Sequence, residues 1–281
     1  MLDRSSFAAI ALAAGLWATT ADAQIVDLSK YPDLSGQWSR VPDGGVPRYD
    51  PSKPLYKQEA PLKPEYQARW EASVKDIQAG GFGLDTHYAC MPMAMPRQMS
   101  GISLMEFVMT PDLTRVIYED STAQTRRVYT DGRDFPKDRE PTFTGYSIGK
   151  WLDTDGDGKF DTLEVETRNI RGPRQYDQSG IPAADDNEAV IKERLYLDKT
   201  NKDILLNEIT TTDNAFTRPW SVLKKYRRAQ GEARWEENNC VESNAYITIN
   251  KEVYFVSHDG HLMPQKKDQS PPDLRYFNVK K

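Results

Sequence analysis

The residues with the clearest chemical role form the stretch DTDGDGKFDTLE, which spans positions 153–164. Acidic residues occupy its first, third, fifth, ninth and twelfth places, and Gly158 occupies the sixth, which is the pattern of an EF-hand calcium loop. The predicted Ca²⁺ ligands are Asp153, Asp155, Asp157, the backbone carbonyl of Lys159, Asp161 and Glu164. The alternative is a solvated acidic turn, although carboxylates this close together repel one another without a cation.

The segments on either side of this loop, YSIGKWL and LEVETRNI, do not show the residue spacing of a helix. We therefore expect the loop to connect two β-strands rather than the two helices of an EF-hand. Calcium needs only about six to eight oxygen ligands and a chain that can curl around it, so helices are not required. The predicted role of Ca²⁺ is structural: the ion stiffens a connection between strands and implies nothing about catalysis.

A second set of polar residues falls on strand faces that would line the inside of a barrel. In RRVYTDGR at 126–133, strand alternation puts Arg127, Tyr129 and Asp131 on one face. In AVIKERLYL at 189–197, Glu193 interrupts an apolar face and needs a partner, for which an arginine is the natural choice. The candidate catalytic residues are Glu119, Arg127, Tyr129, Glu193 and Asp213, and the candidate ligand-binding residues are Arg127, Tyr129, Tyr146, Arg218 and Trp220.

These polar residues support two interpretations. In the first, arginine–carboxylate pairs form a buried structural network that ties strands together. In the second, they form a polar patch in a ligand cavity, where Glu119, Glu193 or Asp213 has a shifted pKa and acts as an acid or base. Arg127 or Tyr129 would then hold an oxyanion. The sequence alone leaves both interpretations open.

Alternation of apolar and polar residues predicts β-strands over most of the chain after residue 103. The expected strands are 104–110, 114–120, 125–130, 144–151, 163–170, 189–197, 204–211, 221–227 and 245–249, with turn-forming residues between them. One helix is expected at 64–78, where Tyr66, Trp70 and Val74 recur at a spacing of four. Many short strands with little helix are typical of a barrel or a sandwich.

The fold class expected from these elements is mostly β: an antiparallel barrel of roughly eight to ten strands with a proline-rich N-terminal wrap and one helix. Gly36-Gln37-Trp38 resembles the Gly-x-Trp signature of lipocalins, in which the tryptophan closes one end of a ligand-holding barrel. The expected layout is a signal peptide at 1–23 and a single β-barrel domain at 24–281. Within that domain, 24–100 is a wrapping segment with the first strand and the helix, 101–250 contains the main barrel strands, and 251–281 is a C-terminal strap.

The N-terminal residues predict export to the periplasm or the cell exterior. Arg4 precedes an apolar run from Phe7 to Trp17, and Ala-Asp-Ala at 21–23 is typical of a signal-peptide cleavage site. The run is too short for a transmembrane anchor, and no anchor is expected elsewhere in the chain. Two cysteines, Cys90 and Cys240, predict a disulfide in an oxidising compartment, with a pair of buried free thiols as the alternative.

The charge balance excludes one class of partner. The 281 residues include 37 Lys+Arg and 42 Asp+Glu, and removal of the predicted signal peptide takes away one basic and two acidic residues. The remaining 36 basic and 40 acidic residues give a net charge of −4. A nucleic-acid-binding protein needs a basic surface, so no nucleic-acid partner is expected.

Several motifs resemble those of a large family of exported bacterial proteins of unassigned function. They are RRVYTDGR at 126–133, GYSIGKW at 145–151, DNAFTRPW at 213–220 and PPDLRYF at 271–277, together with DLSGQW at 33–38 and CMPMAMPR at 90–97. The resemblance covers nearly the whole chain after the signal peptide and implies a lipocalin-like or barrel-like fold, but no reaction. Many members carry histidine where Tyr146 stands, and others near Ala184 or at Asn214, so this chain would not share any imidazole chemistry of theirs.

The function expected from the sequence is binding of a small apolar or aromatic molecule inside the barrel. The alternative is a cofactor-free lyase, isomerase or hydrolase that acts in the same cavity. A structural or partner-binding role would be favoured if side chains fill the barrel. The only cofactor expected is the structural Ca²⁺, and the sequence fixes neither the ligand nor the oligomeric state.

Overall fold

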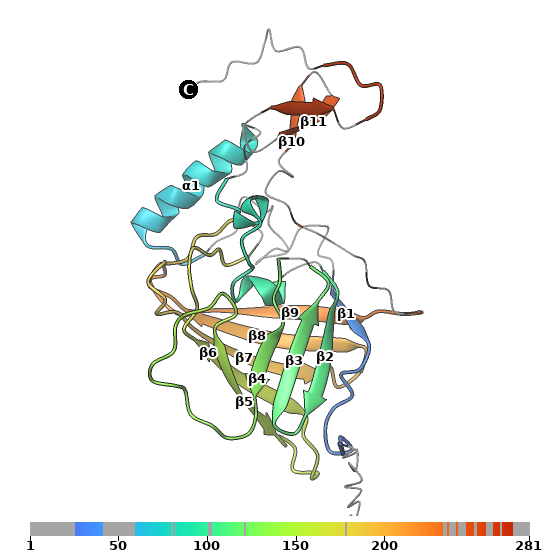
Figure 1. Cartoon of the computed structure of the whole chain (residues 1–281). Helices are drawn as coiled ribbons and strands as arrows, with labels where there is room; N and C mark the ends of the chain where they lie inside the picture. Colours follow the sequence, from blue (N-terminus) through green and yellow to red (C-terminus); the bar gives the residue numbers. More distant parts are fainter. Residues whose placement is uncertain are drawn as a thin grey trace, which may run out of the picture.

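Nine strands form a closed β-barrel in the computed structural model of the chain (Figure 1). They are β1 (Gln37–Arg40), β2 (Met105–Thr110), β3 (Leu113–Tyr118), β4 (Arg126–Tyr129), β5 (Tyr146–Leu152), β6 (Thr162–Arg168), β7 (Val190–Leu197), β8 (Ile204–Thr212) and β9 (Trp220–Arg228). The structure describes residues 26–41, 60–79, 81, 83–100, 103–120, 122–177, 179–232, 235, 240, 246–249, 252–256, 261–264 and 266–271. The predicted signal peptide and residues 42–59 of the proline-rich segment lie outside these ranges. The closed barrel confirms the expected fold class.

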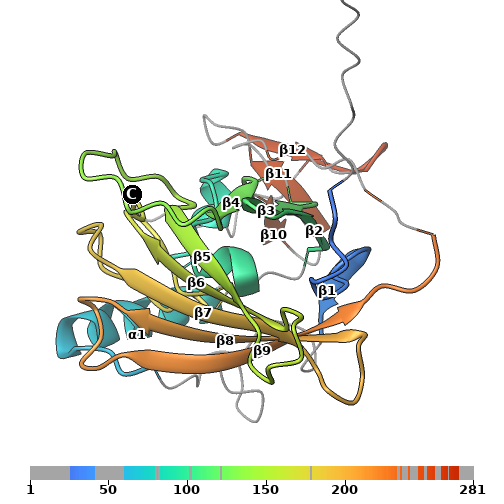
Figure 2. The same ribbon diagram turned by 90° about the horizontal axis from the view of Figure 1, so that it is seen from below.

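The barrel strands follow one another in chain order, and β1 closes the barrel by pairing with both β2 and β9. Figure 2 shows β5 to β9 side by side in this order. The pairs are antiparallel with one exception, because β4 and β5 run parallel, with Val128 opposite Ser147. The prediction that all barrel strands are antiparallel was therefore wrong for the β4–β5 pair. Parallel neighbours need a long crossover connection, and residues 130–145 supply it.

Alternation along the strands separates the barrel interior from its outer surface. In β7, Ile191, Glu193 and Leu195 are buried, whereas Lys192 and Arg194 are exposed. The interior is filled mainly by large apolar side chains, among them Trp38, Phe107, Val116, Leu163, Val165, Ile191, Leu205, Ile209 and Tyr226. These residues share one continuous hydrophobic core, as is usual for a single packed barrel.

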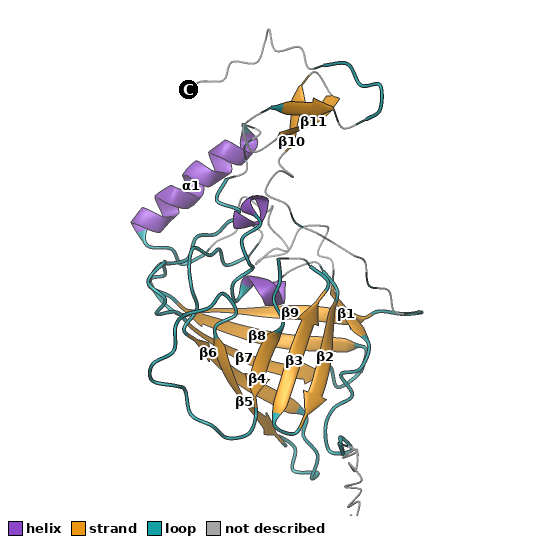
Figure 3. Cartoon of the chain, viewed as in Figure 1, coloured by secondary structure: helices purple, strands orange, loops and turns teal. Residues whose placement is uncertain are grey.

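One end of the barrel is covered by loops and by the helix α1 (Pro64–Gln78), drawn in purple in Figure 3. The helix has the bounds that the sequence predicts, and its first turn contains proline, which needs no backbone hydrogen bond there. Trp70 is buried, and its Nε1 donates to the carbonyl of Ser179 at 3.4 Å. The short helices η2 (Thr86–Ala89) and η3 (Arg97–Ser100) lie in the same covering layer. Among the described residues, no helix combines the length and apolar character needed to cross a membrane.

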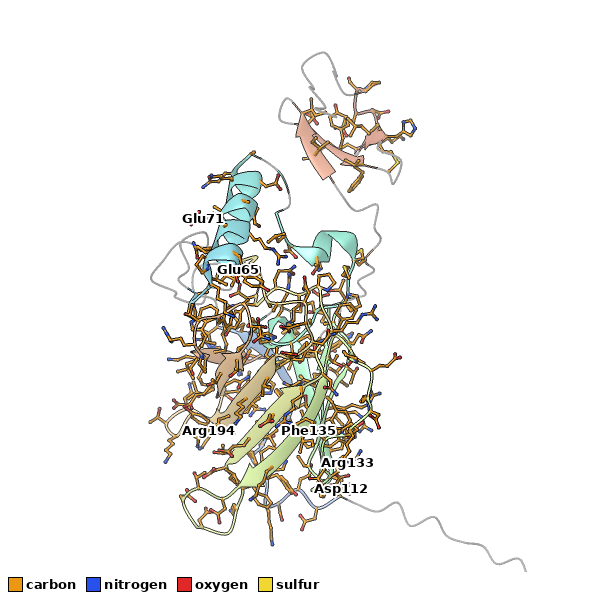
Figure 4. The ribbon with its side chains drawn as sticks, turned by 90° about the vertical axis from the view of Figure 1, so that its left-hand side faces the viewer. Glu65, Glu71, Asp112, Arg133, Phe135 and Arg194 are labelled. Carbon is orange, nitrogen blue, oxygen red and sulfur yellow. A yellow bond between two sulfur atoms is a disulfide. The ribbon has the colours of Figure 1, made fainter. Side chains whose placement is uncertain are left out.

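A separate three-stranded sheet contains β10 (Tyr246–Ile249), β11 (Glu252–Val256) and β12 (Leu262–Pro264). Figures 1 and 4 both show it beyond the α1 end, apart from the barrel strands. This corrects the expectation that β10 belongs to the barrel, and it shows two short strands, β11 and β12, in the part of the chain expected to be a strap. Residues 272–281 of that strap, with most of the PPDLRYF motif, lie outside the described residues. The alternation of β10 was read correctly as a strand, but its hydrogen-bonding partner is the neighbouring β11.

A disulfide joins Cys90 to Cys240 across a sequence separation of 150 residues, with the two Cα atoms 5.6 Å apart. This confirms the predicted pairing. We expect protein denatured without reductant to show no free thiol, because Cys90 and Cys240 are its only cysteines. After reduction, a thiol-reactive dye should titrate both. A titratable thiol before reduction would contradict the disulfide.

Candidate functional site

An ion pair between Arg126 on β4 and Glu193 on β7 crosses the inside of the barrel. The exposed fractions of the two side chains are 1% and 0%. Two hydrogen bonds join them, one of them from Nη1 to Oε1 at 3.2 Å. Asn207 on β8 donates to the same Glu193 Oε1 at 2.9 Å. Arg126 also donates to the hydroxyls of Thr167 at 2.8 Å and Ser147 at 3.2 Å, so five strands contribute to one network.

The electrostatics of this network favour a fixed ion pair. Burial acts against the charged guanidinium, but the Glu193 carboxylate outweighs it and raises the pKa of Arg126. Burial also raises the pKa values of two nearby tyrosines, Tyr118 and Tyr226, so both phenols stay neutral at physiological pH. Their hydroxyls donate to Met99, to its sulfur at 3.1 Å and to its carbonyl, respectively. The network is therefore charged but closely paired.

The inward position expected for Arg127 is wrong. Arg127 is exposed on the outer face of β4, and its neighbour Arg126 lies inside. The reason is the register of β4, which directs Val128 into the core between Thr114 on β3 and Ser147 on β5. Val128, two residues after Arg126, is apolar, and this could have indicated that Arg126 shares the inward face of the strand. Two adjacent arginines concealed it, because both were suitable partners for a carboxylate.

The acids Glu119 and Asp213 do not join Glu193. Glu119 follows the end of β3 and is half-buried, and its backbone amide donates to Leu104 at 3.0 Å. Asp213 is buried at the α1 end of the barrel, where Arg174 donates to Oδ2 at 2.6 Å. The other oxygen, Oδ1, accepts from the backbone amides of Ala184 and Ala215 at 2.9 and 2.8 Å. Asp213 therefore acts as a clamp between the 171–189 segment and the β8–β9 turn.

The aromatic candidates are divided between two other places. Tyr129 and Tyr146 stack with ring centroids 5.1 Å apart, and the guanidinium of Arg133 lies over Tyr129 at 4.0 Å. Figure 4 shows Arg133 and Phe135 close together on this side of the barrel, and the Phe135 ring contacts Tyr146. This cluster holds the 130–145 crossover against β4 and β5.

The remaining two candidates lie at the β8–β9 turn. Trp220 is buried there in an aromatic cluster, 4.3 Å from the Tyr176 ring and 5.4 Å from the Phe216 ring. Arg218 is exposed. The residues predicted as one site are thus spread over the interior, the α1 end and the outer surface.

A pocket of about 740 Å³ lies outside the barrel interior, where the β5–β6 loop meets the segment before β1 and the end of β7. Its volume is within the range of small-molecule sites. The apolar and aromatic part of its wall consists of Tyr31, Pro32, Phe160, Tyr196 and Leu197. We call it the end pocket. Sequence reasoning missed these residues, although Phe160 stood out as the only aromatic residue among the acids of the 153–164 loop.

The aromatic wall of the end pocket is held by specific contacts. The Tyr31 ring lies 5.0 Å from Phe160 and 5.4 Å from Trp151. The backbone amide of Phe160 donates to the carbonyl of Lys30 at 2.7 Å, which ties the loop to the N-terminal segment. The Tyr196 hydroxyl donates to Glu208 at 2.7 Å, and this hydrogen bond raises the pKa of Tyr196. Burial raises the pKa of Tyr31 as well. The phenol groups of Tyr31 and Tyr196 therefore both stay neutral.

The acidic loop at 153–164 forms one side of the end pocket and connects β5 to β6, as the sequence predicts. Carboxylate oxygens of Asp153, Asp155 and Asp161 lie within 4.8 Å of one another. Asp153 also accepts from the backbone amides of Gly156 and Gly158 at 2.7 and 2.9 Å, which curls the chain around its side chain. Three of the six predicted calcium ligands are thus gathered.

One atom in this group fits a cation in particular. Oδ2 of Asp161 accepts from the amide and hydroxyl of Thr154 at 3.1 and 2.6 Å. Oδ1 of the same carboxylate is buried and has no hydrogen-bond partner among the described residues. Burial would raise the pKa of Asp161, but the hydrogen bonds from Thr154, together with the nearby Thr162 hydroxyl, outweigh it and lower the pKa. Asp161 is therefore a carboxylate with one buried oxygen left for a metal ion.

Two other predicted ligands, Glu164 and Asp157, make other contacts in the absence of an ion. Glu164 pairs with Arg194 at 3.4 Å on the outer surface, and Asp157 accepts from the amide of Lys159 at 2.8 Å.

No protein-family model, no curated protein and no solved structure matches this chain. Its function therefore has to be inferred from its own residues.

Proposed function

We propose that this chain is an exported binding protein that takes a small apolar or aromatic molecule in the end pocket. The observation that carries the proposal is the aromatic wall of Tyr31, Phe160 and Tyr196 around a volume of about 740 Å³. Ligand pockets are typically lined by apolar and aromatic side chains with a few polar groups, and this wall has that composition. This site replaces the expected one inside the barrel, because large apolar side chains fill the interior, a feature that also favours the structural or partner-binding alternative.

The interior offers a weaker site for the alternative, an enzyme without a cofactor. A general acid or base must lie within hydrogen-bonding reach of its substrate. The side chain of Glu193 is 0% exposed and is occupied by Arg126 and Asn207. Asp213 is likewise fully engaged by Arg174 and two backbone amides. Both acids have the geometry of structural pairs, which favours binding over catalysis.

We further propose that the 153–164 loop binds Ca²⁺ through Asp153, Asp155 and Asp161, with Asp157, Glu164 and the Lys159 carbonyl as the other predicted ligands. The buried, unpartnered Oδ1 of Asp161 supports this assignment, because oxygen is the ligand that Ca²⁺ prefers. The ion would supply positive charge and fix the loop. Export through a signal peptide at 1–23 is compatible with the disulfide, and membership of the exported bacterial family named above stays a prediction.

The binding proposal predicts that the uncharged aromatic fluorophore N-phenylnaphthylamine binds in the presence of Ca²⁺. We expect Tyr196→Ala and Phe160→Ala each to weaken its affinity about tenfold, which corresponds to about 1.4 kcal/mol, because each removes one aromatic face. Fluorescence titration measures the affinity, and thermal melting shows that the variants are folded. Leu223→Ala is the matched control, since Leu223 is an exposed apolar residue elsewhere on the barrel. Equal affinity in all four proteins would exclude the end pocket.

A further inference from the structure

We infer that the ligand of the end pocket carries an anionic group, and that Ca²⁺ in the loop controls its affinity. This inference rests on the proposed function and on the proposed calcium site. The 153–164 loop does not merely lie near the end pocket, because its residues form part of the pocket wall. The loop residues that line the pocket are Thr154, Asp155, Asp157, Lys159, Phe160 and Asp161.

The charges around the end pocket are nearly balanced without an ion. Five cationic side chains and four carboxylates line it, which gives a formal charge of +1. Three of those carboxylates belong to the calcium loop: Asp155, Asp157 and Asp161. Bound Ca²⁺ would add two positive charges, which the carboxylate of Asp153, a proposed ligand outside the lining, would offset in part. A bound cation is often the largest local charge in a site, so it decides which ligand charge the site attracts.

Three of the cationic side chains remain available to an anion: Lys159 of the loop, Lys199 and Lys202. Arg194 is paired with Glu164 at 3.4 Å and Glu208 at 3.7 Å, and Arg228 donates to Asp203 at 3.0 Å. By contrast, Lys159, Lys199 and Lys202 form no ion pair with any described residue and are exposed, although the charge of Lys199 also helps to lower the pKa of Asp161. They stand on the pocket wall with the aromatic rings. A ligand with an aromatic body and a carboxylate or sulfonate would match both groups.

A mechanical link connects the loop to the aromatic wall. Phe160 belongs to the calcium loop, its amide bonds to Lys30, and its ring contacts Tyr31. An ion that fixes the loop would therefore also fix two of the aromatic rings of the pocket. This effect should act on every aromatic ligand, whereas the charge effect should act on anions alone. The two contributions can be separated with a charged and an uncharged probe.

The experiment compares anilinonaphthalenesulfonate, an aromatic anion, with the uncharged N-phenylnaphthylamine, each with Ca²⁺ and with a chelator. We expect Ca²⁺ to tighten binding of the anion about tenfold more than binding of the uncharged probe. The double variant Lys199→Gln, Lys202→Gln should weaken anion binding about tenfold and leave the uncharged probe unchanged. Lys192→Gln, an exposed lysine on the outer face of β7, is the control. Because coupling is reciprocal, the anion should raise the calorimetric affinity for Ca²⁺ by the factor that Ca²⁺ has on the anion.

Each remaining outcome has a clear meaning. If both probes bind with the same calcium dependence, or if the double lysine variant binds both equally well, the inference is overturned and the proposed function stands. Binding of the uncharged probe with no calcium effect on either probe has the same consequence. If neither probe binds in either condition, the proposed function fails, and the inference fails with it.

Discussion

Replacing Glu193 by alanine is expected to lower the free energy of unfolding by about 3–5 kcal/mol. The change leaves the buried guanidinium of Arg126 without its counter-charge and removes the acceptor of Asn207 Nδ2. A buried charge without a partner is far more costly than the ion pair is favourable, because its lost hydration is no longer compensated. Urea unfolding followed by circular dichroism measures the effect as a shift of the midpoint at constant slope.

Two further variants give this result its meaning. Arg127→Ala is the matched control, because Arg127 is adjacent in sequence but exposed, and we expect a change within about 0.5 kcal/mol. The double variant Arg126→Met, Glu193→Leu should recover most of the lost stability, since apolar residues of similar size can replace a buried ion pair. It should also keep the affinity for N-phenylnaphthylamine, because the end pocket lies elsewhere. A single Glu193→Ala variant as stable as Arg127→Ala would show that the pair is not buried in solution.

The sequence predicted the elements of the fold better than their partners. Strand alternation located β2 to β10 to within a few residues, and the helix at 64–78 was placed with its bounds, but β11 and β12 were not predicted. The parallel pairing of β4 with β5 was missed, because the length of the 130–145 crossover does not encode the direction in which the next strand enters the sheet. The separate sheet of β10 was missed for a similar reason, since alternation does not identify the neighbouring strand.

The site was predicted less well than the fold. The need of Glu193 for an arginine was recognised, but the choice between Arg126 and Arg127 depended on the register of a four-residue strand. The acidic loop could be read from the sequence because its ligands are local. The end pocket could not, because its residues lie in distant segments: β6–β7 pairing brings Phe160 near Tyr196, and Tyr31 joins them through the segment before β1. Local patterns thus reveal loop sites, whereas pockets built from distant segments require the structure.

Removal of calcium is expected to lower the melting temperature by about 5–10 °C when wild-type protein is first saturated with the ion. An ion that binds only the folded state at about a hundred times its dissociation constant stabilises it by about 2.7 kcal/mol. In a chain of this size, each kcal/mol shifts the melting temperature by about 2–4 °C. Differential scanning calorimetry with Ca²⁺ and with a chelator measures the difference.

The double variant Asp155→Ala, Asp157→Ala should abolish this sensitivity. It is a better test than removal of Asp153 or Asp161, because Asp153 accepts several backbone amides and Asp161 accepts both the amide and the hydroxyl of Thr154, whereas Asp155 and Asp157 each accept one backbone amide. In chelator, the double variant should melt within about 2 °C of wild type, since it loses weak loop contacts and also mutual repulsion between carboxylates. Asp134→Asn, an exposed acid outside the loop, should keep the full calcium response. If the double variant responds to Ca²⁺ as wild type does, the ion is bound elsewhere and the end pocket loses its proposed control.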